Sequence, residues 1–109
     1  DIIEIDRVAA APARFGDRFL QRIYTTGEIA YCRGRAPQLA ARFAAKEAVM
    51  KALKSSGMND PIPFSSIEIR SADNGEPVVI LDIKHQGHCR VSISHTESHA
   101  IAFAIYTPK

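Results

Sequence analysis

Residues 42–53 combine a strong helical pattern with charges placed where a buried helix should be apolar. At about 100° per residue, one face carries an apolar stripe that is typical of packing against a core. The stripe comprises Leu39, Phe43, Met50 and Leu53. Lys46 projects into the middle of this stripe, Glu47 and Lys51 lie one turn apart along one edge, and Arg42 lies along the other. The pattern predicts charges that converge on something buried and multiply charged.

An ordinary interpretation of these charges is that they are surface features. Glu–Lys pairs at this spacing stabilise an exposed helix by only about 0.2–0.5 kcal/mol. A lysine can also lay its methylenes over apolar surface while its ammonium reaches water. For Lys46 two interpretations stay open, namely a buried pairing at a subunit interface and a lysine extended towards solvent.

The length and composition predict one small domain with a thin core. The 109 residues are 46% hydrophobic and rich in alanine, with no Trp, so we expect the chain to oligomerise. No apolar run is long enough to cross a membrane, and no signal peptide pattern is present. Cys32 and Cys89 are far apart in the sequence and are expected to be free thiols. The sequence therefore predicts a cytoplasmic protein.

Basic residues concentrate in the first half of the chain. Residues 1–54 hold ten Lys or Arg against six Asp or Glu, whereas residues 55–109 hold four against six. Such asymmetry suits nucleic acid, nucleotide phosphates or an acidic protein, and charge alone does not choose among them.

The first half is predicted to be one strand followed by helices. Residues 1–5 have the composition of a strand that is cut short at its beginning, so we expect residues to precede it. Asp6 is expected to cap the next helix and Pro12 to end or bend it, with helical character resuming over 14–24 and 26–32. Within 14–24 a basic ridge lies beside an apolar ridge, which suits either a docking face or an ordinary amphipathic helix. The ridges comprise Arg14, Arg18 and Arg22, and Phe15, Phe19 and Ile23.

The second half changes from a helical to a strand period. The central helix should begin near Pro37 and stop at Gly57. Beyond a loop, alternating patterns and turns predict an antiparallel meander. Its strands cover residues 67–70, 78–84, 89–94 and 100–106. We therefore predict a single α+β domain over residues 1–109, with an N-terminal strand and helices and one long central helix packed on a C-terminal antiparallel sheet.

Two carboxylates are the best candidates for holding a metal. Asp1 belongs to the first strand, and Glu47 lies on the central helix among cations. Two carboxylates and waters suit Mg²⁺, which commonly completes its coordination with substrate phosphates. Lys51 and Arg42 could neutralise the remaining charge of a phosphoryl group during its displacement.

A second polar cluster, Ser94-His95-Thr96, lies between two predicted strands. Backbone and side-chain donors there could hold a phosphate. A Ser–His hydrolase is disfavoured because no elbow motif surrounds the serines. A metal site at residues 85–89 is disfavoured because the segment lacks the paired ligand spacing of zinc sites.

Taken in order, these pieces resemble the holo-acyl-carrier-protein synthase family, the small 4′-phosphopantetheinyl transferases. The resemblance spans the chain and is carried by residues 1–7, 42–51, 67–69 with 74–77, and 91–96. The segment Arg-Phe-Ala-Ala-Lys-Glu-Ala-Val-Met-Lys is highly specific for the superfamily. Ile3 stands where the larger branch of the superfamily has a glutamate. The chain thus resembles the small branch, whose members form homotrimers with active sites between subunits.

The resemblance implies Mg²⁺-dependent transfer of phosphopantetheine from coenzyme A to a serine of apo acyl carrier protein, in fatty acid biosynthesis. Adenosine 3′,5′-bisphosphate would be released, and the serine proton would pass to Glu47 or to a metal-bound water. Asp1 and Glu47 would hold the metal and, with Lys51, form the catalytic set. Residues implied to bind coenzyme A are Arg42, Lys51, Pro77, Ser94, His95 and Thr96. Residues implied to dock the carrier are Arg7, Arg14, Phe15, Arg18, Phe19 and Arg22.

Two other functions compete with this one. The first is a module that binds coenzyme A or nucleotide phosphates without transferring anything. The second is a Mg²⁺ nuclease, which is disfavoured because such enzymes usually set Glu-x-Lys on a strand, whereas Glu47 and Lys51 are four apart on a helix. We therefore expect no nucleic acid partner and no membrane contact.

Overall fold

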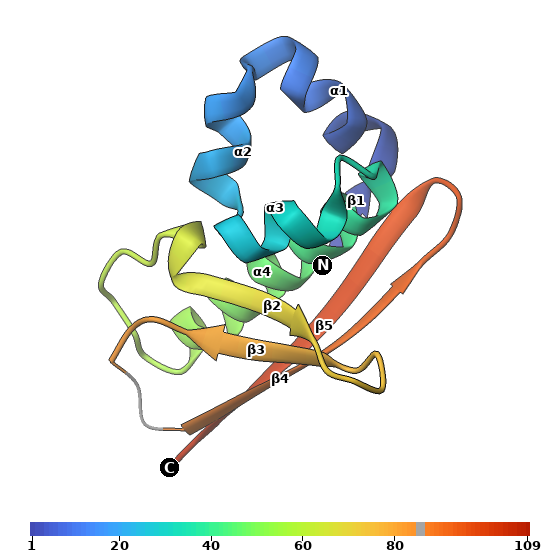
Figure 1. The fold of residues 1–109 in the computed structure, drawn as a ribbon. Coiled ribbons are helices and arrows are strands. Elements are labelled where there is room, and N and C mark those ends of the chain that lie inside the picture. Colours follow the sequence, from blue (N-terminus) through green and yellow to red (C-terminus); the bar gives the residue numbers. More distant parts are fainter. Residues whose placement is uncertain (85–86) are drawn as a thin grey trace.

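A long central helix, α4, organises the computed structural model of the chain (Figure 1). The structure describes residues 1–84 and 87–109, and for residues 12–15 and 17 it describes the backbone without the side chains. The elements in chain order are β1 (Ile2–Glu4), α1 (Ile5–Phe15), α2 (Asp17–Ile23), α3 (Thr26–Cys32), α4 (Ala36–Ser55), the 3₁₀ turn η1 (Phe64–Ser66), β2 (Ile67–Ser71), β3 (Pro77–Leu81), β4 (Gly87–His95) and β5 (His99–Pro108). The predicted α+β class is confirmed.

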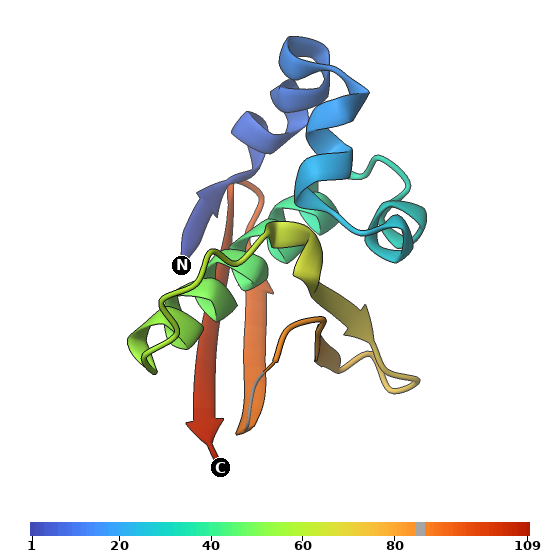
Figure 2. The same ribbon diagram turned by 90° about the vertical axis from the view of Figure 1, so that its left-hand side faces the viewer.

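Helix α4 is covered on more than one side. Strands β4 and β5 cross one face of it, and α1 and α3 pack against other parts (Figure 2). Small side chains such as Ala40, Ala44 and Ala45 are buried and let neighbouring backbones approach closely. Pro37 lies in the first turn, and Gly57, at φ 106°, follows the helix end. No helix in the described part of the chain is long and apolar enough to span a membrane.

The strands form two sheets, so the predicted single meander is wrong. One sheet has the order β1-β5-β4, and β2 and β3 form a separate hairpin. Strand β3 ends at Leu81, and one further hydrogen bond, from the Asp82 amide to the Ser66 carbonyl (2.8 Å), extends its pairing with the β2 side of the hairpin. The first strand instead pairs with the last one, with Ile2 opposite Ile101.

Strand β5 has one face towards α4 and one towards solvent. Ala100 and Ala102 are buried beneath the helix. The alternate residues Ile101, Phe103 and Ile105 are 46%, 65% and 55% exposed. Because directly paired residues share a face, Ile2 extends this apolar row onto β1.

The N-terminal helices begin and end at other residues than predicted. Asp6 lies within the first turn of α1 and does not cap it, because the helix already begins at Ile5. The helix continues through Pro12 to Phe15, although an interior proline removes a helical hydrogen bond and crowds the preceding turn. The break comes at Gly16, whose φ of 78° and ψ of −179° favour glycine.

This break also changes the predicted basic and apolar ridges. Arg14 and Phe15 belong to α1, whereas Arg18, Phe19 and Arg22 belong to α2. A four-residue spacing aligns side chains only along one continuous helix. The single ridge over residues 14–24 is therefore wrong.

A buried ion pair joins three elements at the centre of the fold. Lys46 Nζ on α4 lies 2.6 Å from Glu28 Oε1 on α3, and both side chains are 0% exposed. The other carboxylate oxygen, Oε2, accepts a hydrogen bond from the Ile69 amide of β2 (2.8 Å). Thr25 and Glu28 also form a reciprocal capping box at the start of α3.

This ion pair shows that neither earlier interpretation of Lys46 is correct. Its partner lies in the same chain, so a subunit interface is not needed, and its ammonium does not reach solvent. Burial lowers the pKa of Lys46, and the hydrogen bond that its ammonium donates to Glu28 opposes that shift. The lysine is tolerated in the apolar stripe because a carboxylate is buried with it.

We predict that Lys46→Met destabilises the protein by about 3–5 kcal/mol, because it leaves the Glu28 carboxylate buried without its cation. Adding Glu28→Gln should recover much of the loss, since no unpaired charge then remains. Urea denaturation measures both changes, with the exposed Lys54→Met as control. Equal stability of Lys46→Met and the control would contradict the prediction.

Candidate active site

Asp1 and Lys51 form an ion pair between β1 and α4. Lys51 Nζ lies 2.5 Å from Asp1 Oδ1; the lysine side chain is 68% exposed and the aspartate side chain 14%. The backbone holds Asp1 in place, because its carbonyl accepts a hydrogen bond from the Ala102 amide (2.8 Å). The second carboxylate oxygen, Oδ2, is buried and accepts no hydrogen bond from the residues that the structure describes.

Glu47 lies on the same side of α4 as this pair. It is half-buried and precedes Lys51 by one helical turn. Because Lys51 reaches Asp1, both carboxylates flank the same stretch of helix surface. The structure brings Asp1 and Lys51 together, and the inclusion of Glu47 in one site with them stays a prediction.

The donor set fits Mg²⁺. Among the described residues, no three His, Cys, Asp or Glu side chains are placed to share a metal ion. Two carboxylates, with waters and substrate phosphates as further ligands, match the preference of Mg²⁺ for oxygen. The buried Oδ2 of Asp1 is an acceptor left free for such a cation.

Arg42 belongs to a different cluster. Its guanidinium carbon lies 4.0 Å from the centre of the Tyr31 ring, and Nη2 donates to Ser71 Oγ (3.0 Å). Arg42 is only 6% exposed, and its Nε is buried without a partner in the described chain. The pKa of the Tyr31 phenol is lowered, first by its own side-chain hydrogen bond with Ser71 and then by the positive charge of Arg42.

This cluster lines a second cavity, of about 300 Å³. Its lining includes Arg70 and Glu68 from β2 as well as Tyr31, Arg42 and Ser71. A guanidinium with a free N–H, two hydroxyls and a second arginine suit an anion such as phosphate. We call Arg42, Tyr31 and Ser71 the anion cluster.

The two groups of charges lie on different sides of α4. At about 100° per residue, Arg42 lies about 140° from Glu47 and about 180° from Lys51 around the helix axis. The prediction that these charges converge is therefore wrong within one chain. The neighbouring elements account for this separation. Asp1, next to β1, pairs with Lys51. Tyr31 of α3 and Ser71 of β2 contact Arg42.

The other predicted coenzyme A residues lie in two separate places. Pro77 pairs with Ser71 across the hairpin and so lies beside the anion cluster. Ser94 and His95 are exposed at the end of β4, two strands from β1. Thr96 follows in the turn, where its hydroxyl accepts from the amides of residues 98 and 99 (3.3 and 3.1 Å).

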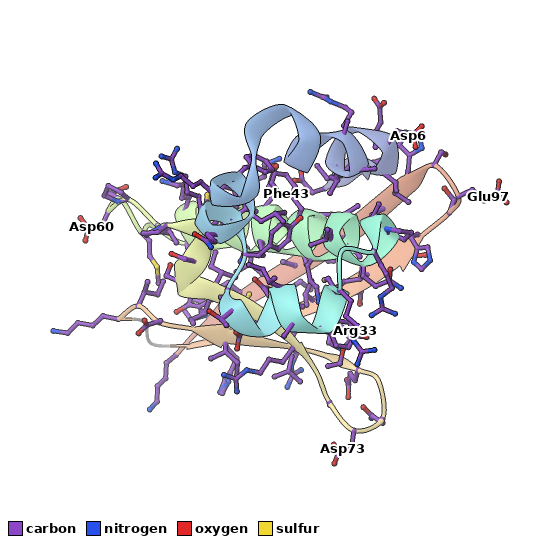
Figure 3. The ribbon with its side chains drawn as sticks, turned by 45° about the horizontal axis from the view of Figure 1, so that its top comes forward. Asp6, Arg33, Phe43, Asp60, Asp73 and Glu97 are labelled. Carbon is purple, nitrogen blue, oxygen red and sulfur yellow. The ribbon has the colours of Figure 1, made fainter. Side chains whose placement is uncertain are left out.

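Two of the predicted docking residues, Arg7 and Phe19, line a larger cavity. It measures about 680 Å³ and lies between β1, α1, α2 and α4, with Arg7, Phe19, Phe43 and Glu47 in its lining. Figure 3 shows Phe43 between α4 and the N-terminal helices. Arg18 and Arg22 are exposed on α2. The side chains of Arg14 and Phe15 lie outside the described part.

Several site residues were not predicted from the sequence. Tyr31 and Ser71 complete the anion cluster, and His99 lines the larger cavity with Glu47. Glu28 had a readable signal, because Thr25-Thr-Gly-Glu28 has the spacing of a capping box. No local pattern links Tyr31 to Ser71, since they meet only through tertiary packing.

Comparisons with known proteins identify the family of the chain. The sequence profile of the 4′-phosphopantetheinyl transferase superfamily matches residues 1–104. A holo-[acyl-carrier-protein] synthase of Koribacter versatilis is 42% identical over 116 aligned positions, covering 96% of this chain and 92% of that protein. One from Dehalococcoides mccartyi strain 195 is 45% identical with the same coverage.

Solved structures give the same result. The Helicobacter pylori holo-[acyl-carrier-protein] synthase in complex with coenzyme A superposes with a TM-score of 0.86 at 31% identity, covering 98% of this chain and 96% of that one. The Bacillus anthracis enzyme in complex with CoA (3′,5′-ADP) gives 0.80 at 32% identity, covering 100% and 93%. The chain therefore belongs to the 4′-phosphopantetheinyl transferase superfamily, among the holo-[acyl-carrier-protein] synthases.

Proposed function

We propose that this protein transfers the 4′-phosphopantetheine group of coenzyme A to a serine of an apo acyl carrier protein, in fatty acid biosynthesis. The observation that carries the proposal is the group of Asp1, Glu47 and Lys51 on one side of α4, with a free buried oxygen on Asp1. The Helicobacter pylori relative, solved with coenzyme A, supports the choice of donor.

The serine hydroxyl attacks the phosphorus next to the pantetheine arm, and the bond to the adenosine 3′,5′-bisphosphate leaving group breaks. Asp1 and Glu47 would hold Mg²⁺, which when bound supplies positive charge to the pyrophosphate oxygens. The exposed ammonium of Lys51 neutralises charge that develops on the leaving phosphate. The serine proton passes to Glu47 or to a water beside it.

The anion cluster binds a phosphate of coenzyme A held by a neighbouring subunit. One chain presents the Asp1–Glu47–Lys51 group and the anion cluster on different sides of α4, so one donor molecule would have to bridge two chains to meet both. The exposed apolar row on β5 offers a surface for such contacts, since Phe103 is 65% exposed. We propose a homotrimer with active sites between subunits.

The acidic carrier docks on α1 and α2. The exposed side chains of Arg7, Arg18 and Arg22 supply positive charge there. The cavity between these helices and α4, lined by Phe19 and Phe43, takes an apolar side chain of the carrier. Both cysteines are free, which agrees with a reducing cytoplasmic location.

Incubation with coenzyme A, Mg²⁺ and apo carrier should add the mass of one phosphopantetheine to the carrier. Glu47→Gln should lower kcat at least about 100-fold, because a metal ligand and proton acceptor is lost. Mass spectrometry of the carrier measures both, and circular dichroism checks the fold. The exposed Glu97→Gln is the control. No mass gain with several carriers would leave only the non-catalytic binding module.

Arg18→Glu should raise the KM for the carrier about fivefold to tenfold and leave the KM for coenzyme A unchanged, because it reverses a charge facing an acidic partner. The difference from wild type should shrink as salt screens the contact. Steady-state kinetics at two ionic strengths measure this, with Lys84→Glu as the matched charge reversal. A raised KM for coenzyme A with an unchanged KM for the carrier would show that the carrier docks elsewhere.

Two inactive variants should restore each other if active sites form between subunits. Glu47→Gln and Arg42→Met damage different sides of α4. When mixed trimers assemble at random from equal amounts, about a quarter of the sites combine an intact Glu47 with an intact Arg42 from a neighbour. Activity after co-refolding should approach that fraction. A mixture no more active than either variant alone would show that each chain carries a complete site.

A further inference from the structure

The buried Glu28–Lys46 pair contacts the same three elements that build the anion cluster. Glu28 lies on α3, Lys46 on α4, and Ile69, whose amide donates to Glu28, on β2. Tyr31, Arg42 and Ser71 come from these same elements, one from each. A single carboxylate therefore fixes the positions of three backbones that each carry one cluster residue.

On each of the three elements, the cluster residue is close in sequence to the residue of the ion pair network and lies on the same face of the element. Tyr31 follows Glu28 by three residues on α3, and Arg42 precedes Lys46 by four on α4, which in both cases is one helical turn. Ser71 follows Ile69 by two residues on β2, the strand repeat that returns to the same face. Glu28 and Ile69 also line the cavity of the anion cluster.

The side-chain contacts of the cluster run mainly among its own three members. Arg42 donates a hydrogen bond to Ser71 and stacks on Tyr31, whose phenol also shares a hydrogen bond with Ser71, and Arg42 Nε is buried without a partner among the described residues. The Tyr31 ring that stacks on it is 47% exposed. The relative placement of the three side chains thus depends on how α3, α4 and β2 are joined beneath them, and misplacement of a binding group by about 1 Å is costly.

We propose that Glu28 and Lys46 are positioning residues for coenzyme A. Their buried ion pair sets the geometry of the anion cluster and so the affinity for the donor, without touching it. The inference rests on the proposed function, because it takes a phosphate of coenzyme A as the ligand of the cluster.

The double variant Glu28→Gln/Lys46→Met tests this, because it removes both charges together. In the folded variant the KM for coenzyme A should rise at least fivefold, while kcat and the KM for the carrier stay within twofold. Val49→Ala, a truncation of a buried residue on the same helix, is the matched control and should lower the thermal midpoint without changing the KM for coenzyme A. An unchanged KM in the folded double variant, or an equal rise in the control, would overturn the proposal.

A measurement on the wild-type protein covers the case in which the double variant does not fold. Saturation with adenosine 3′,5′-bisphosphate should slow hydrogen exchange of the Ile69 amide at least threefold. A ligand that orders the anion cluster should also stabilise the hydrogen bond from this amide to Glu28. The amide of Ile80, on the exposed face of the hairpin, should not change. Equal exchange at Ile69 with and without the nucleotide would overturn the proposal.

Different results would contradict the proposed transfer and the proposed positioning role. A wild-type protein that adds no mass to any carrier refutes the proposed transfer. An active wild-type protein whose folded double variant binds coenzyme A normally refutes only the positioning role.

Discussion

The contact between Glu28 and Lys46 is the interaction on which most of the architecture depends. Two opposite charges with no solvent exposure are costly to desolvate, and only close geometry with further hydrogen bonds compensates for that cost. Here the Ile69 amide and the Thr25 capping box supply those bonds. Because the bonds come from α3 and β2, the chain can satisfy the charges only when both elements are correctly placed on α4. The pair therefore gives specificity to a core built largely from alanine.

Helix α4 separates two kinds of chemistry. On one side, Lys51 meets Asp1 beside Glu47, which suits a cation and the reacting phosphate. On the other side, the nearly buried Arg42 meets Tyr31 and Ser71, which suits a phosphate that only needs to be held. A buried arginine with a free N–H is costly to keep unless a ligand uses it. The separation thus fits the proposed site between subunits, in which each group of a chain serves a different donor molecule.

The sequence predicted local features well and long-range features poorly. The 3.6 repeat, Pro37 and Gly57 placed α4 correctly, because these signals act within a few residues. Alternation predicted the strands but not the pairing of Ile2 with Ile101, which lie at opposite ends of the chain. For the site, a helical wheel ordered Arg42, Lys46 and Lys51 around an axis but could not say which element covers each side. Their positions on the first strand and the central helix singled out Asp1 and Glu47 as candidates, and only tertiary structure added Tyr31 and Ser71.

The exposed row on the outer sheet face links stability to the site. Ile101, Phe103 and Ile105 alternate along β5, and Ile2 continues the row on β1, so the apolar surface is contiguous. Contiguous patches of this kind are uncommon on soluble monomers and usually mark an interface. A small chain with a core rich in alanine gains stability by covering such a face with further copies of itself. In the proposed trimer, a neighbouring copy would also supply the anion cluster for each Asp1–Glu47–Lys51 group. One assembly would then satisfy both requirements, and folding stability and catalysis would depend on the same contacts between subunits.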